Sequence, residues 1–129
     1  MKDPARRKAD LIVEAARKHK AFDLVLLKVD HLTSIADYFF ICSCRSSRQV
    51  QAVSEQIKDL LKTKGGYKTY GVEGQTQGHW VLMDFGEVVV HIFHEPVRDF
   101  YNLEGLWGEA HFIDLGPDDS DDRMSETLQ

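Results

Sequence analysis

Two strongly apolar runs, separated by a glycine, dominate the sequence between His79 and Phe93. This pattern predicts a β-hairpin with Phe85-Gly86 as its two-residue turn. That turn fixes a register with three central facing pairs: Trp80 with His91, Leu82 with Val89, and Val81 with Val90. The register is decisive, because a slip of one residue would exchange the two faces of the hairpin.

Alternation along the two strands sorts their side chains onto two faces of different character. One face is almost entirely aliphatic and is predicted to be core: His79, Val81, Met83, Val88, Val90 and Ile92. The other mixes aromatic, acidic and imidazole groups: Trp80, Leu82, Asp84, Val89, His91 and Phe93. Such a mixture is typical of a surface that binds a partner.

The rest of the chain alternates between helical and strand patterns. Ser46 and Gln49 have the spacing of a capping box at the start of the clearest helix. The predicted elements are a helix from Pro4, strands at Asp23–Asp30 and Tyr38–Ser43, a helix at Ser46–Lys64, a strand at Tyr67–Glu73, the hairpin, and a helix from Glu95 followed by a short turn to Trp107. This order predicts an α/β (α+β) domain over residues 1–116, with a five-stranded mixed sheet packed against helices. Residues 117–129 are predicted to be an acidic, disordered tail.

The predicted helices are too few to cover both faces of that sheet. Two long helices can cover one face, which leaves only the short C-terminal segments for the other. From those segments Val97, Tyr101 and Phe100 are expected to pack inward. Because the hairpin is apolar on both sides, part of one face of the sheet is expected to stay uncovered in the free chain. A second copy of the chain or another protein is expected to cover it.

Composition and charge narrow the classes of partner. The net charge is −5 over 129 residues, distributed as +4 in residues 1–20, −5 in 21–117 and −4 in 118–129. No basic field is large enough to predict direct phosphate binding, so direct nucleic-acid readout is not expected. The chain has no apolar signal core or membrane-spanning run, so a cytoplasmic protein without a membrane partner is expected. Cys42 and Cys44, two apart in a strand, are expected to be buried, reduced thiols.

Short motifs that resemble catalytic or metal sites lack the residues that would complete them. Asp84-Phe85-Gly86 matches a kinase metal motif, but the rest of a kinase is missing and glycine is ordinary in a tight turn. His91 and His94 would point to opposite faces of a strand, which disfavours a metal pair. Ser46-Ser47 opens a helix and is interpreted as a cap.

A nucleotidyltransferase is the more serious enzymatic alternative, because its small domain has a related order of elements. That chemistry needs a Gly-Ser phosphate loop and strand acids that hold two metal ions. Here the corresponding helix start reads Cys44-Arg45-Ser46-Ser47, and the only Asp-x-Asp is Asp119-Ser120-Asp121 in the tail. We therefore predict no catalytic residue, no metal site and no cofactor.

Three segments together resemble the Iojap family, the ribosomal silencing factors (RsfS): Asp37–Val50, Tyr70–Phe93 and Arg98–Trp107. The resemblance implies a nucleotidyltransferase-like fold without catalytic activity. It also implies binding to the large ribosomal subunit, through a ribosomal protein on the subunit-joining face, which blocks association with the small subunit. Cys44 and Arg45 depart from the family's usual glycine and small hydroxyl residue, so the resemblance assigns that turn no role.

Ten positions match the family's motifs: Glu73, Gly74, Trp80, Asp84, Gly86, His91, Arg98, Tyr101, Leu103 and Trp107. Of these, Trp80 is expected to anchor the interface. The predicted partner-binding residues are Trp80, Leu82, Asp84, His91, Glu73, Arg98 and Tyr101. Three questions stay open: whether Tyr101 and Trp107 belong to the interface or the core, whether the chain silences ribosomes or assists large-subunit assembly, and whether it forms a homodimer when free.

Overall fold

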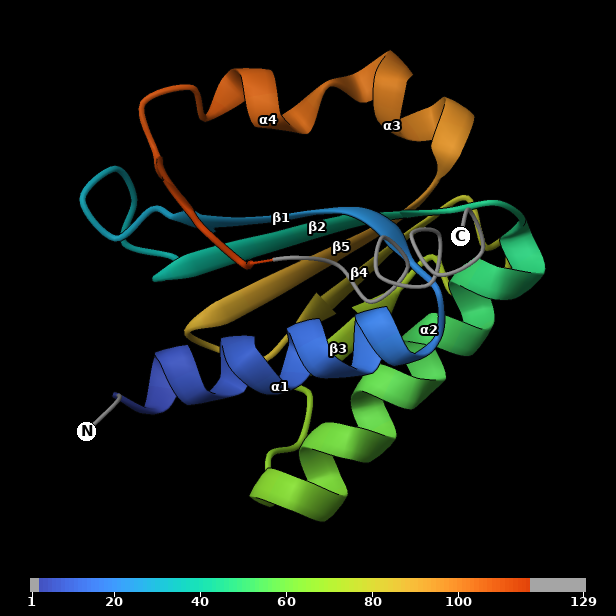
Figure 1. Cartoon of the computed structure of the whole chain (residues 1–129), viewed down its shortest axis with the longest axis horizontal. Helices are drawn as coiled ribbons and strands as arrows, with labels where there is room; N and C mark the ends of the chain where they lie inside the picture. Colours follow the sequence, from blue (N-terminus) through green and yellow to red (C-terminus); the bar gives the residue numbers. More distant parts are fainter. Residues whose placement is uncertain (1–2, 117–129) are drawn as a thin grey trace, which may run out of the picture.

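A mixed six-stranded sheet with helices on both faces organises the chain in the computed structural model, which describes residues 3–116 (Figure 1). The strand order is β3-β4-β5-β2-β1-β6; β2 and β5 are parallel, and the other described neighbours are antiparallel. The elements are α1 (Pro4–Lys18), β1 (Phe22–Lys28), β2 (Tyr38–Cys44), α2 (Ser47–Leu60), the π-helical turn η1 (Leu61–Gly65), β3 (Gly71–Glu73), β4 (Trp80–Asp84), β5 (Val88–His94), α3 (Glu95–Tyr101), α4 (Leu103–Leu106) and β6 (His111–Ile113). The predicted α/β (α+β) class is confirmed, whereas the prediction of five strands is wrong. The predicted acidic tail lies outside the described residues.

Both edges of the sheet differ from the sequence prediction. The additional strand, β6, pairs with β1 from Leu26↔Ile113 to Lys28↔His111. A strand of three residues has too few positions to show alternation, so the sequence pattern gave no signal for it. At the opposite edge, only Gly71–Glu73 of the predicted strand Tyr67–Glu73 pairs with β4.

The start of α1 follows from its sequence. The carboxylate of Asp3 accepts a hydrogen bond from the backbone N–H of Arg6 at 2.8 Å, and Pro4 occupies the first turn, where its missing N–H is not needed. The basic residues Arg17 and Lys18 lie in the last turn, where the helix dipole favours cations. The predicted first helix is confirmed.

The second helix also begins at its predicted cap and ends with an irregular turn. Ser46 Oγ accepts from the N–H of Gln49 at 3.1 Å, and the Gln49 side chain accepts from the N–H of Arg45 at 2.7 Å. The return bond of the capping box therefore reaches one residue further back than the usual pattern. The α-helix gives way to η1 at Leu61, and Gly66, at φ 70°, ends the helical segment in the left-handed region.

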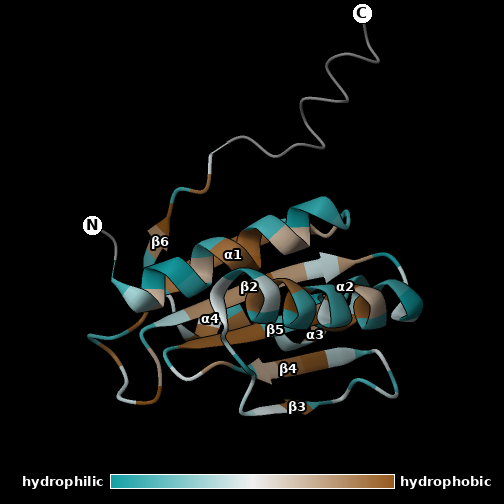
Figure 2. Cartoon of the chain, turned by 90° about the horizontal axis from the view of Figure 1, so that it is seen from below, coloured by the Kyte–Doolittle hydropathy of each residue, from teal (hydrophilic) through white to brown (hydrophobic). Residues whose placement is uncertain are grey.

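The two faces of the sheet have separate cores. α1 and α2 cover one face and enclose the larger apolar cluster, while α3 and α4 lie over the other face (Figure 1). The outer surfaces of α1 and α2 are largely hydrophilic (Figure 2). Cys42 and Cys44 are buried, free thiols of the larger cluster, as predicted. The hydrogen bond to Cys44 and burial raise the pKa of the Cys42 thiol, so this group stays protonated.

The hairpin has the predicted faces but not the predicted register. Its turn is Gly86-Glu87, because the N–H of Phe85 donates to the carbonyl of Val88 at 2.9 Å and Gly86 has a φ of +85°. The facing pairs are Trp80 with Phe93, Val81 with Ile92, and Leu82 with His91. Each partner is displaced by two residues from the predicted one, and a displacement of two keeps every side chain on its face.

Candidate functional site

The helices α3 and α4 cover only part of their face of the sheet. Their apolar residues Val97, Leu103 and Trp107 pack against the smaller core, which comes mainly from β1, β2 and β5. Figure 2 shows β3 and β4 extending beyond these helices along one edge of the sheet. The side chains of that edge on the α3–α4 face are called here the open strip: Glu73, Trp80, Leu82 and Asp84.

Trp80 is the aromatic residue of the open strip, and its ring is held by three neighbours. Its indole N–H donates to Nδ1 of His91 at 3.1 Å. Its ring stacks on Phe93 with centroids 4.8 Å apart and planes at 27°, and the ring of Tyr101 lies at the same centroid distance. The indole remains partly exposed. A large ring fixed in this way is pre-organised for contact with a partner, because little side-chain entropy is left to lose on binding.

His91 supports Trp80 from below and does not reach the surface. The imidazole is 6% exposed, and burial lowers its pKa to about 4. The ring is therefore neutral near pH 7, and since Nδ1 accepts the indole hydrogen bond, the proton resides on Nε2. An edge-on contact with Phe39, at 5.8 Å between centroids, holds the other side of the ring. In the isolated chain His91 is therefore buried behind Trp80, and its predicted part in partner binding stays a prediction.

The two acidic residues give the open strip its charge. Asp84 is partly exposed, and one of its carboxylate oxygens accepts from the N–H of Gly86 at 2.8 Å, so it also shapes the hairpin turn. Glu73 is exposed and pairs across the strands with Leu82, which is partly exposed. An apolar centre with carboxylates at its rim suits a partner surface of mixed apolar and cationic character.

The buried side chain of Arg98 joins α3 to neighbouring elements of the protein. Its guanidinium is buried, donates to the carbonyl of Asp23 and, at 2.9 Å, to the hydroxyl of Ser43, and pairs with Glu104 at 3.0 Å. These bonds connect α3 to β1, β2 and α4. Arg98 thus holds α3 in place from inside the protein, and its predicted part in partner binding stays a prediction.

Exposed apolar side chains extend the open strip onto α3 and α4. The prediction that Tyr101 and Phe100 pack inward is wrong, since they are 50% and 81% exposed, and Leu106 is 75% exposed. A hollow of about 370 Å³ lies between α3 and the open strip. It is lined by His79, Trp80, Pro96, Val97, Phe100 and Tyr101. Sequence reasoning missed Phe100 and Leu106 as exposed residues, because a helix of seven residues shows no dependable periodicity.

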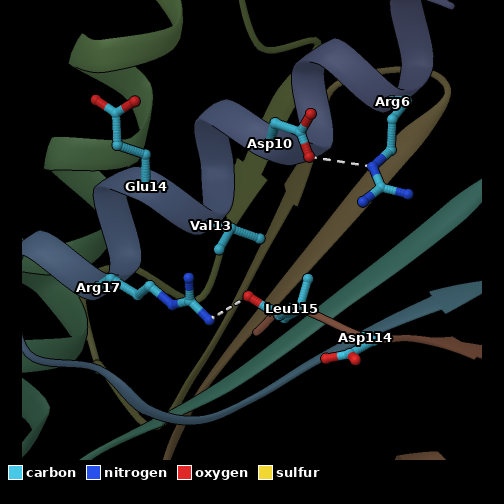
Figure 3. Close-up of a pocket in the computed structure, with 7 residues that line it drawn as sticks. All are labelled: Arg6, Asp10, Val13, Glu14, Arg17, Asp114 and Leu115. Carbon is cyan, nitrogen blue, oxygen red and sulfur yellow. Dashed lines mark hydrogen bonds and ion pairs between the residues drawn. The ribbon is translucent and has the colours of Figure 1, made fainter. Parts of the chain in front are cut away.

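A second hollow lies between α1 and the segment that follows β6, and its charged side chains bind to other groups of the protein (Figure 3). Arg6 pairs with Asp10 at 3.0 Å, and Arg17 donates to the carbonyl of Leu115 at 2.7 Å. The first contact lies within α1, and the second holds the last described residues against that helix. Within residues 3–116, no group of three or more His, Cys, Asp or Glu side chains is placed to hold a metal ion, and no helix there could cross a membrane.

Comparison with known proteins decides the family. The family described as ribosomal silencing factor during starvation, RsfS, matches this chain over residues 2–128. This chain belongs to the ribosomal silencing factor family. The resemblance predicted from three sequence segments is therefore confirmed.

Individual relatives of this silencing factor agree with the assignment. The ribosomal silencing factor RsfS of Bacillus subtilis is 44% identical over 96 residues, which are 74% of this chain and 80% of that protein. A crystal structure of a Chromobacterium violaceum protein superposes with a TM-score of 0.79 at 36% identity, covering 82% of this chain and 88% of that one. A mouse protein named mitochondrial assembly of ribosomal large subunit protein 1 is 31% identical over 107 residues, 81% of this chain and 47% of that protein.

Proposed function

We propose that this silencing factor represses translation by binding the large ribosomal subunit, through a ribosomal protein on the subunit-joining face, and thereby blocking association with the small subunit. Family membership supports the ribosome as the target. The structural observation that carries the proposal is the open strip, where Trp80 is held in place by His91 yet stays partly exposed. Buried interface centres are commonly organised around such an aromatic residue.

Charge favours a basic partner for the open strip. Glu73 and Asp84 flank its apolar centre, and ribosomal proteins are commonly cationic. Complementary charges at the rim of an interface speed association and fix the register of the two surfaces more than they raise affinity. Trp80, Leu82 and the exposed ring of Tyr101 would then supply the apolar contact.

The proposed mechanism is occlusion and requires no chemistry. A domain bound to the joining face of one subunit sterically prevents the other subunit from binding there. The helix start that replaces a phosphate loop, Cys44-Arg45-Ser46-Ser47, has no glycine, and Ser46 is occupied as the cap of α2. Both features support a binding module over a nucleotidyltransferase-like enzyme.

Co-sedimentation with purified subunits tests this function. The chain is mixed in separate tubes with isolated large and small subunits and then with joined ribosomes. We expect a saturable, stoichiometric complex with the large subunit alone, and a smaller fraction of joined ribosomes when the chain is added before the subunits are mixed. Equal sedimentation with both subunits, or with neither, contradicts the proposal.

A role in large-subunit assembly is the second candidate, and the name of the mouse relative favours it. Such a role would use the same open strip at an earlier stage. Removing the protein from cells separates the two candidates: an assembly factor predicts incomplete large subunits during growth, whereas a repressor predicts complete subunits that join too readily under starvation.

A further inference from the structure

Three lysines line one hollow between the end of α2 and the segment that leads into β3. The hollow, of about 390 Å³, is lined by Lys58, Lys62, Tyr67, Lys68 and Thr69. No carboxylate is among these residues. We call it the lysine hollow.

A backbone reversal brings the two sides of the lysine hollow, the end of the helical segment and the segment from Tyr67 to Thr69, next to each other. After η1 the chain reverses at Gly66, which has a φ of +70°. A side chain on Gly65 would collide with the ring of Tyr67, because a Cβ there would lie 2.3 Å from Cδ2 of that ring. Glycine at both positions therefore allows Lys68, on the returning segment, to line the same space as Lys62.

The three lysine side chains of the hollow have no acidic partner among residues 3–116, in contrast to Lys8 and Lys64. Lys8 pairs with Glu87 at 2.6 Å, and Lys64 pairs with Glu14 at 2.7 Å. Among residues 3–116, the side chains of the three lysines of the hollow form no ion pair or hydrogen bond. The chain as a whole carries a net charge of −5, so three lysines around one hollow, with no carboxylate in its lining, form a local positive charge that is opposite in sign to the net charge.

Helix stability explains only part of this arrangement. Lys58 and Lys62 lie near the C-terminal end of the helical segment, where the dipole favours cations. They are also four residues apart, a spacing at which like charges repel. Lys68 lies beyond the helix and gains nothing from the dipole. Asp59 follows Lys58 in sequence but does not line the hollow. An anion in the hollow would relieve the repulsion.

The lysine hollow adjoins the open strip through β3. The Thr69 hydroxyl, at the mouth of the hollow, lies 2.9 Å from the carbonyl oxygen of Asp84, a residue of the strip. We propose that the lysine hollow binds the phosphodiester backbone of RNA beside the protein that the open strip contacts. This inference rests on the proposed function, since a ribosomal subunit exposes RNA next to its proteins. Contact with phosphates reads no sequence, but it departs from the expectation, drawn from the charge distribution, that no basic field is large enough for direct phosphate binding.

The salt dependence of binding tests the inference. The variant Lys58→Gln/Lys62→Gln/Lys68→Gln is compared with Lys18→Gln/Arg48→Gln/Lys20→Gln, which removes the same charge at exposed positions elsewhere. Affinity for isolated large subunits is measured from about 50 to about 200 mM salt. The slope of log affinity against log salt should be shallower by about 2 to 3 in the first variant and unchanged in the control. A first variant with the wild-type slope overturns the inference.

A direct titration with RNA keeps this inference separate from the proposed function. The wild-type chain should bind a short RNA duplex at low salt, and the triple lysine variant should not. If the wild-type chain fails to sediment with large subunits, the proposed function fails while this titration still tests the lysine hollow. The chain's own residues 117–129 are the competing occupant. If deleting them shifts the NMR signals of the three lysines and RNA shifts none, the RNA assignment is overturned.

Discussion

The indole N–H of Trp80 donates a hydrogen bond to Nδ1 of His91 at 3.1 Å, and this bond links the surface of the open strip to the buried layer beneath it. The bond needs a neutral imidazole, because a protonated ring has no free acceptor nitrogen. The orientation of Trp80 therefore depends on the protonation state of a buried residue.

We predict that stability falls in mild acid because of His91. Burial lowers its pKa from 6.5 to about 4 in the folded chain. The unfolded chain binds the proton more readily, so this contribution is fully present above pH 6.5 and is lost as the pH falls toward 4. The loss is about 3 kcal/mol for a shift of this size. Urea denaturation from pH 7 to pH 4.5 measures it.

The control for that prediction is His91→Gln, whose side-chain oxygen can still accept from Trp80 but cannot titrate. Its stability should change less than that of the wild-type chain over the same pH interval. Parallel curves for the two proteins would show that another group, and not His91, causes the loss in acid.

Two aspartate substitutions on opposite faces of the hairpin should have different effects. Val90 is fully buried against α1 and α2, so Val90→Asp buries an unpaired carboxylate and should unfold the domain. Leu82→Asp lies on the open strip and should leave the fold intact while weakening binding to large subunits. Circular dichroism and co-sedimentation compare the two. An unfolded Leu82→Asp beside a folded Val90→Asp would mean that the faces are exchanged.

Arg98→Met should act on stability and not on binding. The substitution removes the bonds to Asp23 and Ser43 and leaves Glu104 without its partner. Breaking a buried pair from one side destabilises a protein by roughly 3 to 5 kcal/mol. Urea denaturation should show this loss, whereas Arg48→Met, at an exposed position, should stay within about 0.5 kcal/mol of wild type. A stable Arg98→Met that no longer binds subunits would place Arg98 in the interface.

The hairpin shows how much of the fold the sequence determines. The alternation of side chains assigns both faces of the paired strands correctly even though it predicts the turn one residue too early. The exception is His79, which is predicted to be core and is exposed beside Trp80. Phe85 explains the error in the turn: it continues the β4 ladder as a fully buried residue and leaves Gly86-Glu87 as the turn. The face of a side chain depends only on whether its position in the strand is odd or even, whereas the register depends on where the turn lies. The faces of a hairpin are therefore predicted more reliably than its register.

The candidate site was harder to predict in its details than in its location. Arg98 and His91 match the family's motifs, but matching motifs do not distinguish a contact residue from a residue that holds one in place. Phe100 was misplaced because α3 is short and ends at Asn102, whose φ of +46° turns the chain sharply. Such a turn depends on tertiary packing and leaves no periodic signal in the sequence.

The most direct test of the central claim compares Trp80→Ala with Trp107→Ala. Both remove a partly buried indole from the same face, but Trp107 packs edge-on against Phe39, at 4.9 Å between centroids, away from the open strip. Light scattering after mixing of large and small subunits measures how far each variant prevents their joining. We predict that Trp107→Ala still blocks joining. Trp80→Ala should stay folded, bind large subunits about 30-fold more weakly or worse, a loss of about 2 kcal/mol, and allow joining. A Trp80→Ala variant that blocks joining as well as the wild-type chain would contradict the account.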